Sequence, residues 1–228
     1  MKSERFKTEL ITNVSHDLKT PLTSIVTYID LLQKEDIQDE KAKEYIDTIA
    51  RQSKKLKKLT EDLIDASKAS SGALNVNMER VNISELLRQS SAEYGERMEA
   101  VNITPVVNMP EEDIYVRADG RLLWRVVENL LQNICKHGMP GTRAYLEAGT
   151  ENGRAVVSFK NISQQQLNIP VEELLERFVQ GDESRSRGGS GLGLSIAESL
   201  TELMKGKLKL SLDGDLFKVE MWFYEDKQ

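Results

Sequence analysis

Apolar residues recur at steps of three and four through the first third of the chain, which is the spacing of one face of an α-helix. The first stripe predicts a long amphipathic helix over residues 4–34, followed by a short, polar and acidic turn over residues 35–40. A second stripe predicts a second helix over residues 41–69. The stripes consist of Phe6, Leu10, Ile11, Val14, Leu18, Leu22, Ile25, Ile29 and Leu32, and of Tyr45, Ile46, Ile49, Leu56, Leu59, Leu63 and Ile64.

Two such helices joined by a short turn are expected to form an antiparallel hairpin. A single hairpin cannot cover both apolar stripes, whereas two copies can bury them at the centre of a four-helix bundle. We therefore predict that residues 1–70 form a helical hairpin that assembles into a homodimer.

The helical pattern stops at Ser70-Ser71-Gly72, where we place a domain boundary. Beyond it, residues 71–228 contain strand-like runs and helical patterns that are largely segregated, which predicts an α+β layer sandwich. Asp213-Gly214-Asp215, between the last two runs, predicts a hairpin. Strands are expected at residues 74–78, 103–107, 114–117, 143–148, 155–161, 207–212 and 217–223, and helices at residues 83–100, 120–137, 171–178 and 192–204.

The composition is that of a folded, acidic chain. Hydrophobic residues make up 39% and charged residues 30%, which is typical of globular rather than disordered proteins. The formal net charge of −6 argues against nucleic acid as a main partner, because a basic surface is missing. No stretch approaches the roughly 20 apolar residues of a membrane span, and the single cysteine, Cys135, is expected to be a small buried residue. We therefore expect the chain as given to be soluble and cytoplasmic.

His16 stands out from the first apolar stripe. Val14 marks the centre of that stripe, and His16 lies about 200° around the helix from it, so its side chain is expected to face solvent. A solvated surface histidine is the plainest interpretation, but two neighbours favour a functional one. Pro21 stands inside the helical pattern, where it removes a backbone hydrogen bond and costs stability, and Asp17 places a carboxylate beside the imidazole.

The run Ser15-His16-Asp17-Leu18-Lys19-Thr20-Pro21-Leu22 resembles the phosphoacceptor motif of bacterial sensor histidine kinases. The resemblance implies that ATP phosphorylates His16, and that Asp17 holds one ring N–H and directs the other nitrogen at the phosphoryl group. It also implies that Thr20 helps place a water that dephosphorylates a partner receiver domain, although Thr20 alone would be an ordinary exposed threonine. A neutral imidazole, with a pKa near ~6.5, suits the nucleophilic role at pH 7.

A second cluster of polar residues lies on one face of the helix expected at residues 120–137. Asn129, Asn133, Lys136 and His137 are spaced so that they line this face beside an apolar stripe. A solvated face is the simple interpretation, but two asparagines in mid-helix are poor helix formers and an odd choice for plain surface.

This string, from Asn129 to His137, resembles the N-box of the Bergerat-type ATP-binding fold. The resemblance implies that Asn133 coordinates Mg²⁺ through its amide oxygen, a hard ligand suited to that ion, and that Asn129, Lys136 and His137 contact phosphates. In hydrolytic relatives such as gyrase, a glutamate that activates water stands where Asn129 stands here. Because asparagine cannot act as a general base and Glu128 is turned about 100° around the helix, the resemblance favours phosphoryl transfer over ATP hydrolysis.

A glycine-rich run, from Gly188 to Leu194, comes directly before the last expected helix. Glycines let backbone amides approach phosphate closely, and a helix N-terminus favours an anion. Joined to the N-box, the run resembles the second glycine box of the same fold, which implies that the nucleotide contacts Gly189, Gly191, Leu192 and Gly193.

The stretch before the glycine run resembles two further parts of that fold. Residues 176–178 resemble the F-box, which implies that Phe178 lies near the nucleotide, and residues 182–185 resemble a mobile lid. A polar stretch with glycines suits a lid that closes on ATP. From this lid, Arg185 or Arg187 would reach the γ-phosphate.

One box departs from the family pattern. Sensor histidine kinases carry D-x-G-x-G after the strand that here ends at Phe159, and this chain has Asn161 in place of the aspartate and Ser163 in place of the first glycine. The family aspartate accepts a hydrogen bond from the adenine amino group. The carbonyl of Asn161 can accept the same bond without charge assistance, and a loss of about 1 kcal/mol would weaken affinity about fivefold.

The resemblance extends over nearly the whole chain, as a dimerisation and phosphotransfer hairpin at residues 1–70 and a GHKL/Bergerat-type catalytic domain at residues 71–228. It implies an ATP- and Mg²⁺-dependent protein-histidine kinase that passes the phosphoryl group to an aspartate of a response regulator. Only fifteen residues precede His16, so sensing and transmembrane parts are expected outside this chain, in a parent attached to the bacterial inner membrane. Two alternatives stay open: a non-catalytic signalling scaffold, and an ATPase that uses the hairpin only to dimerise.

Overall fold

The computed structural model describes residues 21–35, 37–70, 74–166 and 193–226. The chain divides into a helical unit that includes the residues up to Leu74 and an α/β unit that begins at Asn75. Within the described residues, no helix combines the length and the apolar character that crossing a membrane requires.

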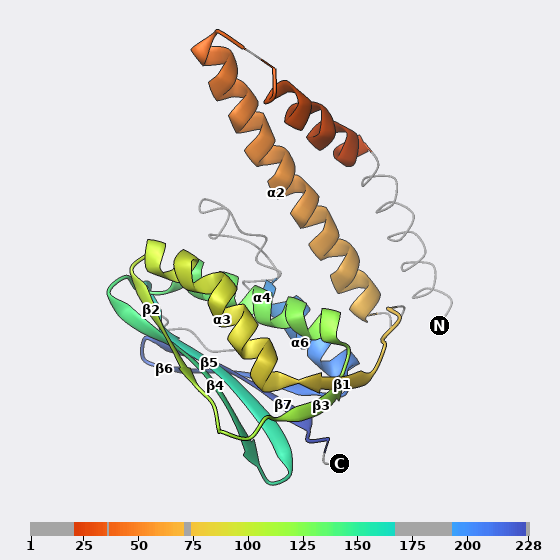
Figure 1. The fold of residues 1–228 in the computed structure, drawn as a ribbon, viewed down its shortest axis with the longest axis vertical. Helices are drawn as coiled ribbons and strands as arrows, with labels where there is room; N and C mark the ends of the chain where they lie inside the picture. Colours follow the sequence, from red (N-terminus) through yellow and green to blue (C-terminus); the bar gives the residue numbers. More distant parts are fainter. Residues whose placement is uncertain (1–20, 36, 71–73, 167–192, 227–228) are drawn as a thin grey trace. The chain divides into compact units, whose positions relative to one another are not determined.

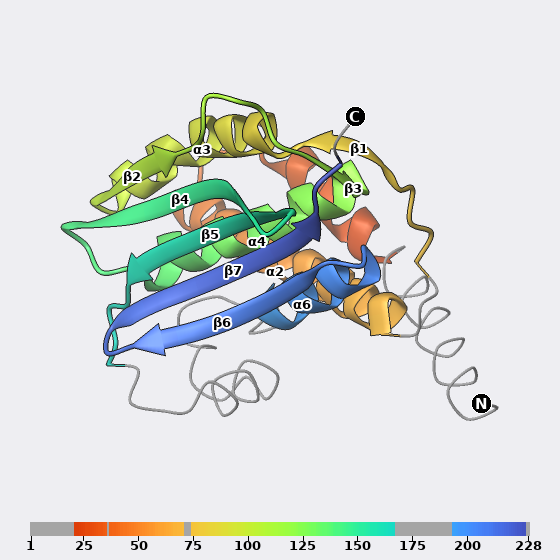
Figure 2. The same ribbon diagram turned by 90° about the horizontal axis from the view of Figure 1, so that it is seen from below.

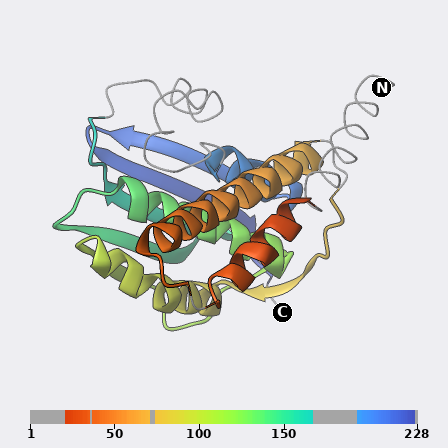
Figure 3. The same ribbon diagram turned by 90° about the horizontal axis from the view of Figure 1, so that it is seen from above.

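The helical unit contains a helix over residues 21–32 and α2 (Glu40–Ser70), which lie side by side (Figures 1 and 3). Two polar contacts show that they run antiparallel: Gln33 Nε2 donates to Asp47 Oδ1 at 2.7 Å, and Lys54 Nζ lies 3.8 Å from Asp30 Oδ1. Asp39 caps α2 by accepting from the backbone N–H of the residues two and three positions further on. The predicted second helix and the turn before it are confirmed, and the first helix is confirmed for residues 21–32.

Only part of the apolar surface of this hairpin is covered within one chain. Leu22 and Ile29 of the first helix and Ala50 of α2 are buried, at 5%, 6% and 6% exposure. Other apolar side chains one or two helical turns away stay open to solvent, with about half or more of their surface exposed: Ile25, Tyr28, Leu31, Leu32, Tyr45, Ile49 and Leu56.

The α/β unit is a two-layer sandwich, in which helices cover one face of the main sheet (Figure 2). The five-stranded sheet has the order β2-β4-β5-β7-β6; β2 and β4 are parallel and every other pair is antiparallel. A second, two-stranded antiparallel sheet joins β1 to β3. The elements are β1 (Glu79–Asn82), α3 (Ile83–Ala100), β2 (Ile103–Asn108), β3 (Tyr115–Ala118), α4 (Gly120–His137), β4 (Thr142–Glu151), β5 (Arg154–Ile162), α6 (Gly193–Leu203), β6 (Lys207–Asp213) and β7 (Leu216–Tyr224).

The core lies between the sheet and the helices. Along β7, buried Phe217, Val219 and Met221 alternate with half-buried Lys218 and Glu220, because successive side chains of a strand point to opposite faces. The helices supply the opposite half of the core, mainly through α4, whose apolar side chains are nearly all below 3% exposure: Leu123, Val126, Val127, Leu130, Leu131 and Ile134. Each such side chain contributes about 1.5–3 kcal/mol by its burial.

The predicted helices and strands of this unit are confirmed within a few residues, with one error. Residues 74–78 were expected to form a strand, yet they are irregular and β1 begins only at Glu79. The side chains do alternate, since Leu74, Val76 and Met78 are half-buried and the residues between them are exposed. Among the described residues this segment has no partner strand, and the backbone N–H of Asn77 donates to the Asp119 side chain instead. The predicted helix at residues 171–178 lies outside the described residues.

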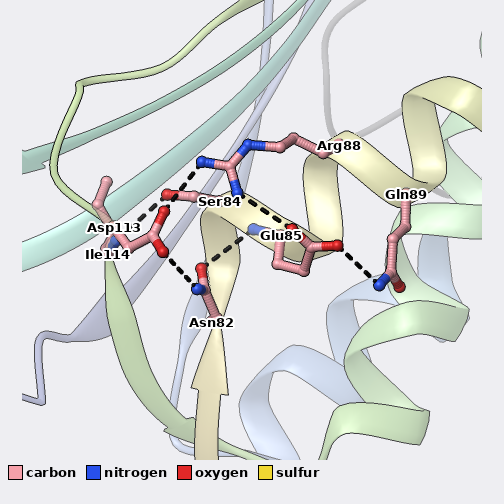
Figure 4. A network of polar contacts seen from close by, with 7 residues as sticks. All are labelled: Asn82, Ser84, Glu85, Arg88, Gln89, Asp113 and Ile114. Atoms are coloured by element: carbon pink, nitrogen blue, oxygen red, sulfur yellow. Dashed lines mark hydrogen bonds and ion pairs between the residues drawn. The ribbon is translucent and has the colours of Figure 1, made fainter.

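A polar network fixes the start of α3 to the loop before β3 (Figure 4). Asn82 caps the helix, with its Oδ1 accepting from the backbone N–H of Glu85 at 3.0 Å and its Nδ2 donating to Asp113 Oδ2 at 2.9 Å. Arg88 donates to both Asp113 and Glu85. The Asn82 amide and the Arg88 guanidinium hold the pKa of the Asp113 carboxyl below its ordinary value.

We predict opposite effects for alanine at two glycines of this unit. Gly138 ends α4, and a Cβ there would lie 2.6 Å from both Ile103 Cδ1 and the backbone oxygen of Ile134. Gly138→Ala should therefore lower the free energy of unfolding by about 1–3 kcal/mol. Gly95→Ala is the matched control: apart from the backbone of its own helix, no atom of the described residues lies within 4 Å of its Cβ position in α3, so it should raise stability by about 0.5–1 kcal/mol.

The measurement is urea unfolding followed by tryptophan fluorescence. Both tryptophans, Trp124 and Trp222, belong to the α/β unit, so the signal reports on this unit alone. Equal stability of the two variants would contradict the packing described around Gly138.

Candidate functional site

α4 carries two interleaved polar pairs, each with a spacing of four residues. Glu128 and Gln132 form the pair that faces α3. There the hydroxyl of Tyr94 donates to Glu128 Oε1 at 3.3 Å. Gln132 Nε2 closes the ring by donating to the Tyr94 hydroxyl at 3.1 Å and to Glu128 Oε1 at 3.0 Å. Burial of Tyr94 raises its pKa to about 12, so it stays a neutral donor at physiological pH. The Glu128 carboxylate is thus held on the α3 side of the helix, as the 100° offset predicts.

Asn129 and Asn133 form the second pair. The side chain of Asn129 carries a buried hydrogen-bond donor that has no partner among the described residues. It is 9% exposed, and its Nδ2 makes no hydrogen bond in the part of the chain that the structure describes. A Cβ at Gly193, the first residue of α6, would lie 3.8 Å from Asn129 Oδ1. An unpaired buried donor costs about 1–3 kcal/mol, and an anionic oxygen placed at the positive end of α6 would satisfy it.

Asn133 lies one turn after Asn129 on the same side of α4 and is half-buried, as are Lys136 and His137 at the end of the helix. Its amide oxygen is a hard donor of the kind that Mg²⁺ accepts. Among the described residues, no cluster of three or more His, Cys, Asp or Glu side chains could hold a metal ion. Asn133 could supply one such oxygen to a divalent ion.

Asn161 lies near the end of β5, on the side of the strand that faces the helices, and is 4% exposed. Its Nδ2 donates to the backbone oxygen of Ile162 at 3.0 Å, which leaves Oδ1 as the free acceptor of the amide. The end of β5 is bonded to the end of α4 through Met139 N to Ile162 O and through Gln164 N to His137 O, both at 2.8 Å. These bonds place Asn161 beside the C-terminal end of the helix that carries both asparagines.

The structure thus brings together several residues predicted from the sequence. Asn129 lies against Gly193, and Asn133, Lys136 and His137 continue along α4 towards Asn161. The remaining predicted site residues lie outside the described part of the chain: His16, Asp17, Thr20, Phe178, Arg185, Gly189, Gly191 and Leu192.

Asp119 is a key residue that the sequence reasoning missed. It precedes α4 and is 1% exposed. Its Oδ1 accepts from the backbone N–H groups of Arg121 and Leu122, at 3.0 and 3.2 Å, and caps the helix. Its Oδ2 accepts from the backbone N–H of Asn77 at 2.9 Å and from Arg121 Nη2 at 3.2 Å. Burial alone would raise the pKa of Asp119, but these hydrogen bonds hold it below the ordinary value.

A sequence signal for Asp119 did exist. An aspartate directly before an amphipathic run is typical of a helix N-cap. The contact with Asn77 had no such signal, because the two residues are 42 positions apart.

Comparison with known proteins agrees with this architecture. Residues 6–72 match the His Kinase A (phospho-acceptor) domain, and residues 118–225 match the family described as histidine kinase-, DNA gyrase B-, and HSP90-like ATPase. The α/β unit is therefore an ATP-binding domain of the GHKL type. With both domains in this order, the chain belongs to the two-component sensor histidine kinases.

Individual relatives align with this chain over 90% or more of its length. The sensor histidine kinase YcbM of Bacillus subtilis is 26% identical over 208 residues, which cover 90% of this chain and 67% of that protein. The structure of full-length ShkA in complex with AMPPNP is 22% identical, covers 96% of this chain and 46% of ShkA, and has a TM-score of 0.81. The structure of ThkA in complex with the response regulator TrrA is 23% identical, covers 98% of this chain and 64% of that chain, and has a TM-score of 0.64. The chain spans from 27% to 67% of the length of its first curated relatives.

We predict that Asn129→Ala separates stability from ligand binding. Removing a buried donor without a partner should leave the free energy of unfolding unchanged or raise it by about 1 kcal/mol. The stabilisation that saturating Mg-ATP gives, read as the shift of Tm in a fluorescence melt, should fall to less than half, because the donor for an anionic oxygen is lost.

Gln132→Ala is the control on the opposite polar pair. It removes the hydrogen bonds to Tyr94 and Glu128, so it should lower stability and leave the Mg-ATP shift intact. A full Mg-ATP shift in Asn129→Ala would contradict the role given to Asn129.

Proposed function

We propose that this chain is an ATP-dependent protein-histidine kinase that phosphorylates His16 and passes the phosphoryl group to an aspartate of a response regulator. The observation that carries the proposal is the buried, unpartnered Nδ2 of Asn129 beside the first residue of α6. This donor and the positive helix end suit a phosphate oxygen better than any neutral group.

We assign a different role in nucleotide binding to each polar residue of α4. Asn129 donates to a phosphate oxygen, Lys136 supplies positive charge, and His137 completes the phosphate contacts. Asn133 fits one coordination position of Mg²⁺, an ion that when bound neutralises charge on the phosphates. His16, with Asp17 fixing its ring, provides the nitrogen that forms the new N–P bond while the bond from the γ-phosphorus to the ADP oxygen breaks.

The residues beside the proposed phosphate position favour phosphoryl transfer over hydrolysis of free ATP. Asn129 cannot deprotonate water, and the carboxylate of the neighbouring Glu128 is bound to Tyr94 and Gln132 on the other side of α4. Water must lose a proton to a general base when it attacks phosphorus, and Asn129 cannot take that proton. A neutral imidazole attacks with its own lone pair, so it is a better phosphoryl acceptor than water at this site.

Base recognition falls to Asn161. Its Nδ2 already donates to Ile162 O, so its Oδ1 is the atom available to accept from the adenine amino group. A neutral acceptor binds less tightly than a carboxylate would, which gives a weaker but intact adenine contact. Phe178, Arg185, Gly189, Gly191, Leu192 and Gly193 are proposed to complete the nucleotide site.

The partner of the phosphorylated chain is proposed to be a receiver domain, as in the complex of ThkA with the response regulator TrrA. Thr20 is the candidate for returning that receiver to its unphosphorylated state. We further propose that the whole protein carries a sensing segment upstream of these residues, is attached to the inner membrane through it, and places this core in the cytoplasm.

We predict that incubation with γ-labelled ATP and Mg²⁺ gives a phosphoprotein whose label is lost in acid and stable in alkali. His16→Gln should abolish the label, while Mg-ATP binding by the variant stays within twofold of wild type. Label that survives this substitution would refute the assignment of His16. Absence of Mg-ATP binding at millimolar concentration would favour the non-catalytic scaffold instead.

We also predict a homodimer held by the exposed apolar residues of the hairpin. Ile25 and Leu32 in the first helix and Ile49 and Leu56 in α2 are each about half exposed, and burial of such side chains drives helix packing. A fragment of residues 1–70 should sediment as a dimer at tens of micromolar. Ile49→Glu should shift it towards monomer, whereas Lys55→Glu, a change at an already polar position, should not.

A further inference from the structure

The side-chain amide of Asn161 carries a hydrogen-bond donor and an acceptor, and its orientation decides which of them a ligand meets. Asn161 lies near the end of β5 at 4% exposure, and its Nδ2 donates to the backbone oxygen of Ile162 at 3.0 Å. In this orientation Oδ1 is the atom left for a ligand. An amino group placed there would donate to Oδ1, whereas a carbonyl group would meet it as acceptor against acceptor.

The backbone oxygen of Ile162, which holds the amide in this orientation, has a second donor. The backbone N–H of Met139 donates to the same oxygen at 2.8 Å. A half-turn of the Asn161 amide would therefore break its own bond to Ile162 and still leave that oxygen paired, which avoids the penalty of an unsatisfied buried acceptor. The half-turn exchanges an NH₂ group for an oxygen of similar size. Gly138 leaves room beside it, since even a Cβ added to Gly138 would lie 3.6 Å from Nδ2.

A carboxylate at position 161 would not have this freedom. Both of its oxygens are acceptors, so no rotation presents a donor to the base. Its charge would strengthen the bond to an amino group and repel a carbonyl group. The amide of Asn161 instead offers an acceptor in the observed orientation and a donor after a half-turn, so it can pair with either group.

We propose that Asn161 widens the substrate class of the nucleotide site from adenine nucleotides to 6-oxopurine nucleoside triphosphates, such as inosine triphosphate (ITP). This inference rests on the proposed function, because it takes Asn161 as the residue that contacts the base. Adenine binds to the amide as observed, and a 6-oxopurine binds to the turned amide, whose Nδ2 donates to the 6-oxo group. Adenine stays preferred by about tenfold, or about 1.4 kcal/mol, because the turned amide gives up its bond to Ile162.

ITP is a matched probe, because its base carries an oxygen where adenine carries the amino group and its ribose and triphosphate are the same. The measurement is the dissociation constant of Mg-ATP and of Mg-ITP for the full chain, by isothermal titration calorimetry. For wild type we expect Mg-ATP to bind about tenfold more tightly. A ratio outside a range of about three to one hundred would overturn the inference. A smaller ratio means that Asn161 does not discriminate between the bases, and a larger one means that its amide does not turn.

Two variants test which atom of the amide serves each nucleotide. Asn161→Ala removes the donor and the acceptor together, so it should weaken Mg-ATP binding by about fivefold to tenfold and leave Mg-ITP binding within about threefold of wild type. Asn161→Asp should strengthen Mg-ATP binding about fivefold and weaken Mg-ITP binding by about tenfold or more, because a carboxylate has no donor for the 6-oxo group. If a melt without nucleotide shows that Asn161→Asp does not fold, the alanine variant decides alone.

Three further outcomes would contradict the inference. Mg-ITP that binds Asn161→Ala more than about threefold more tightly than wild type would mean that a fixed amide repels the 6-oxo group. Mg-ITP that binds Asn161→Asp as tightly as wild type would mean that no donor from residue 161 is used. Binding of neither nucleotide at millimolar concentration would refute the proposed nucleotide site together with this inference, whereas binding of Mg-ATP without Mg-ITP would refute the inference alone.

Discussion

The burial of one stripe of α4 against the sheet is the constraint on which the rest of the α/β unit depends. Six apolar side chains of this helix are almost fully enclosed, and they leave the helix no freedom to rotate. The remaining polar positions are then fixed on either side of the stripe. Glu128 and Gln132 must face α3, and Asn129 must face the first residue of α6. Packing therefore sets the chemistry of each side of the helix.

The spacing of apolar residues predicted helices correctly where the helix packs against apolar neighbours and has a capping residue close to its end in the sequence. α3 and α4 begin and end where the sequence predicts, because Asn82 and Asp119 cap them through neighbours three residues away or fewer. The segment at residues 74–78 misled the prediction for a physical reason. Alternating burial is a property of side chains lying on a surface, and a strand additionally needs a neighbour for its backbone.

In the candidate site, too, features that depend on residues close in sequence could be predicted, and contacts between residues far apart in sequence could not. The polar face of α4 could be predicted from spacing alone, since Asn129 and Asn133 are one helical turn apart. That Asn129 Nδ2 would be buried beside Gly193, or that Asn161 would lie at the end of α4, depends on residues that meet only in the folded unit. The same holds for the hydrogen bond between Asp119 and Asn77, which are 42 positions apart in the sequence.

The pairing of β5 with β7 has a consequence for how this chain tolerates change. These neighbouring strands, Arg154–Ile162 and Leu216–Tyr224, close a loop of about fifty residues that also contains α6 and β6. The entropy cost of closing a loop rises only by about 0.6 kcal/mol for each doubling of its length. The pairing of β5 with β7 would therefore lose little free energy from a change in the length of the chain between them.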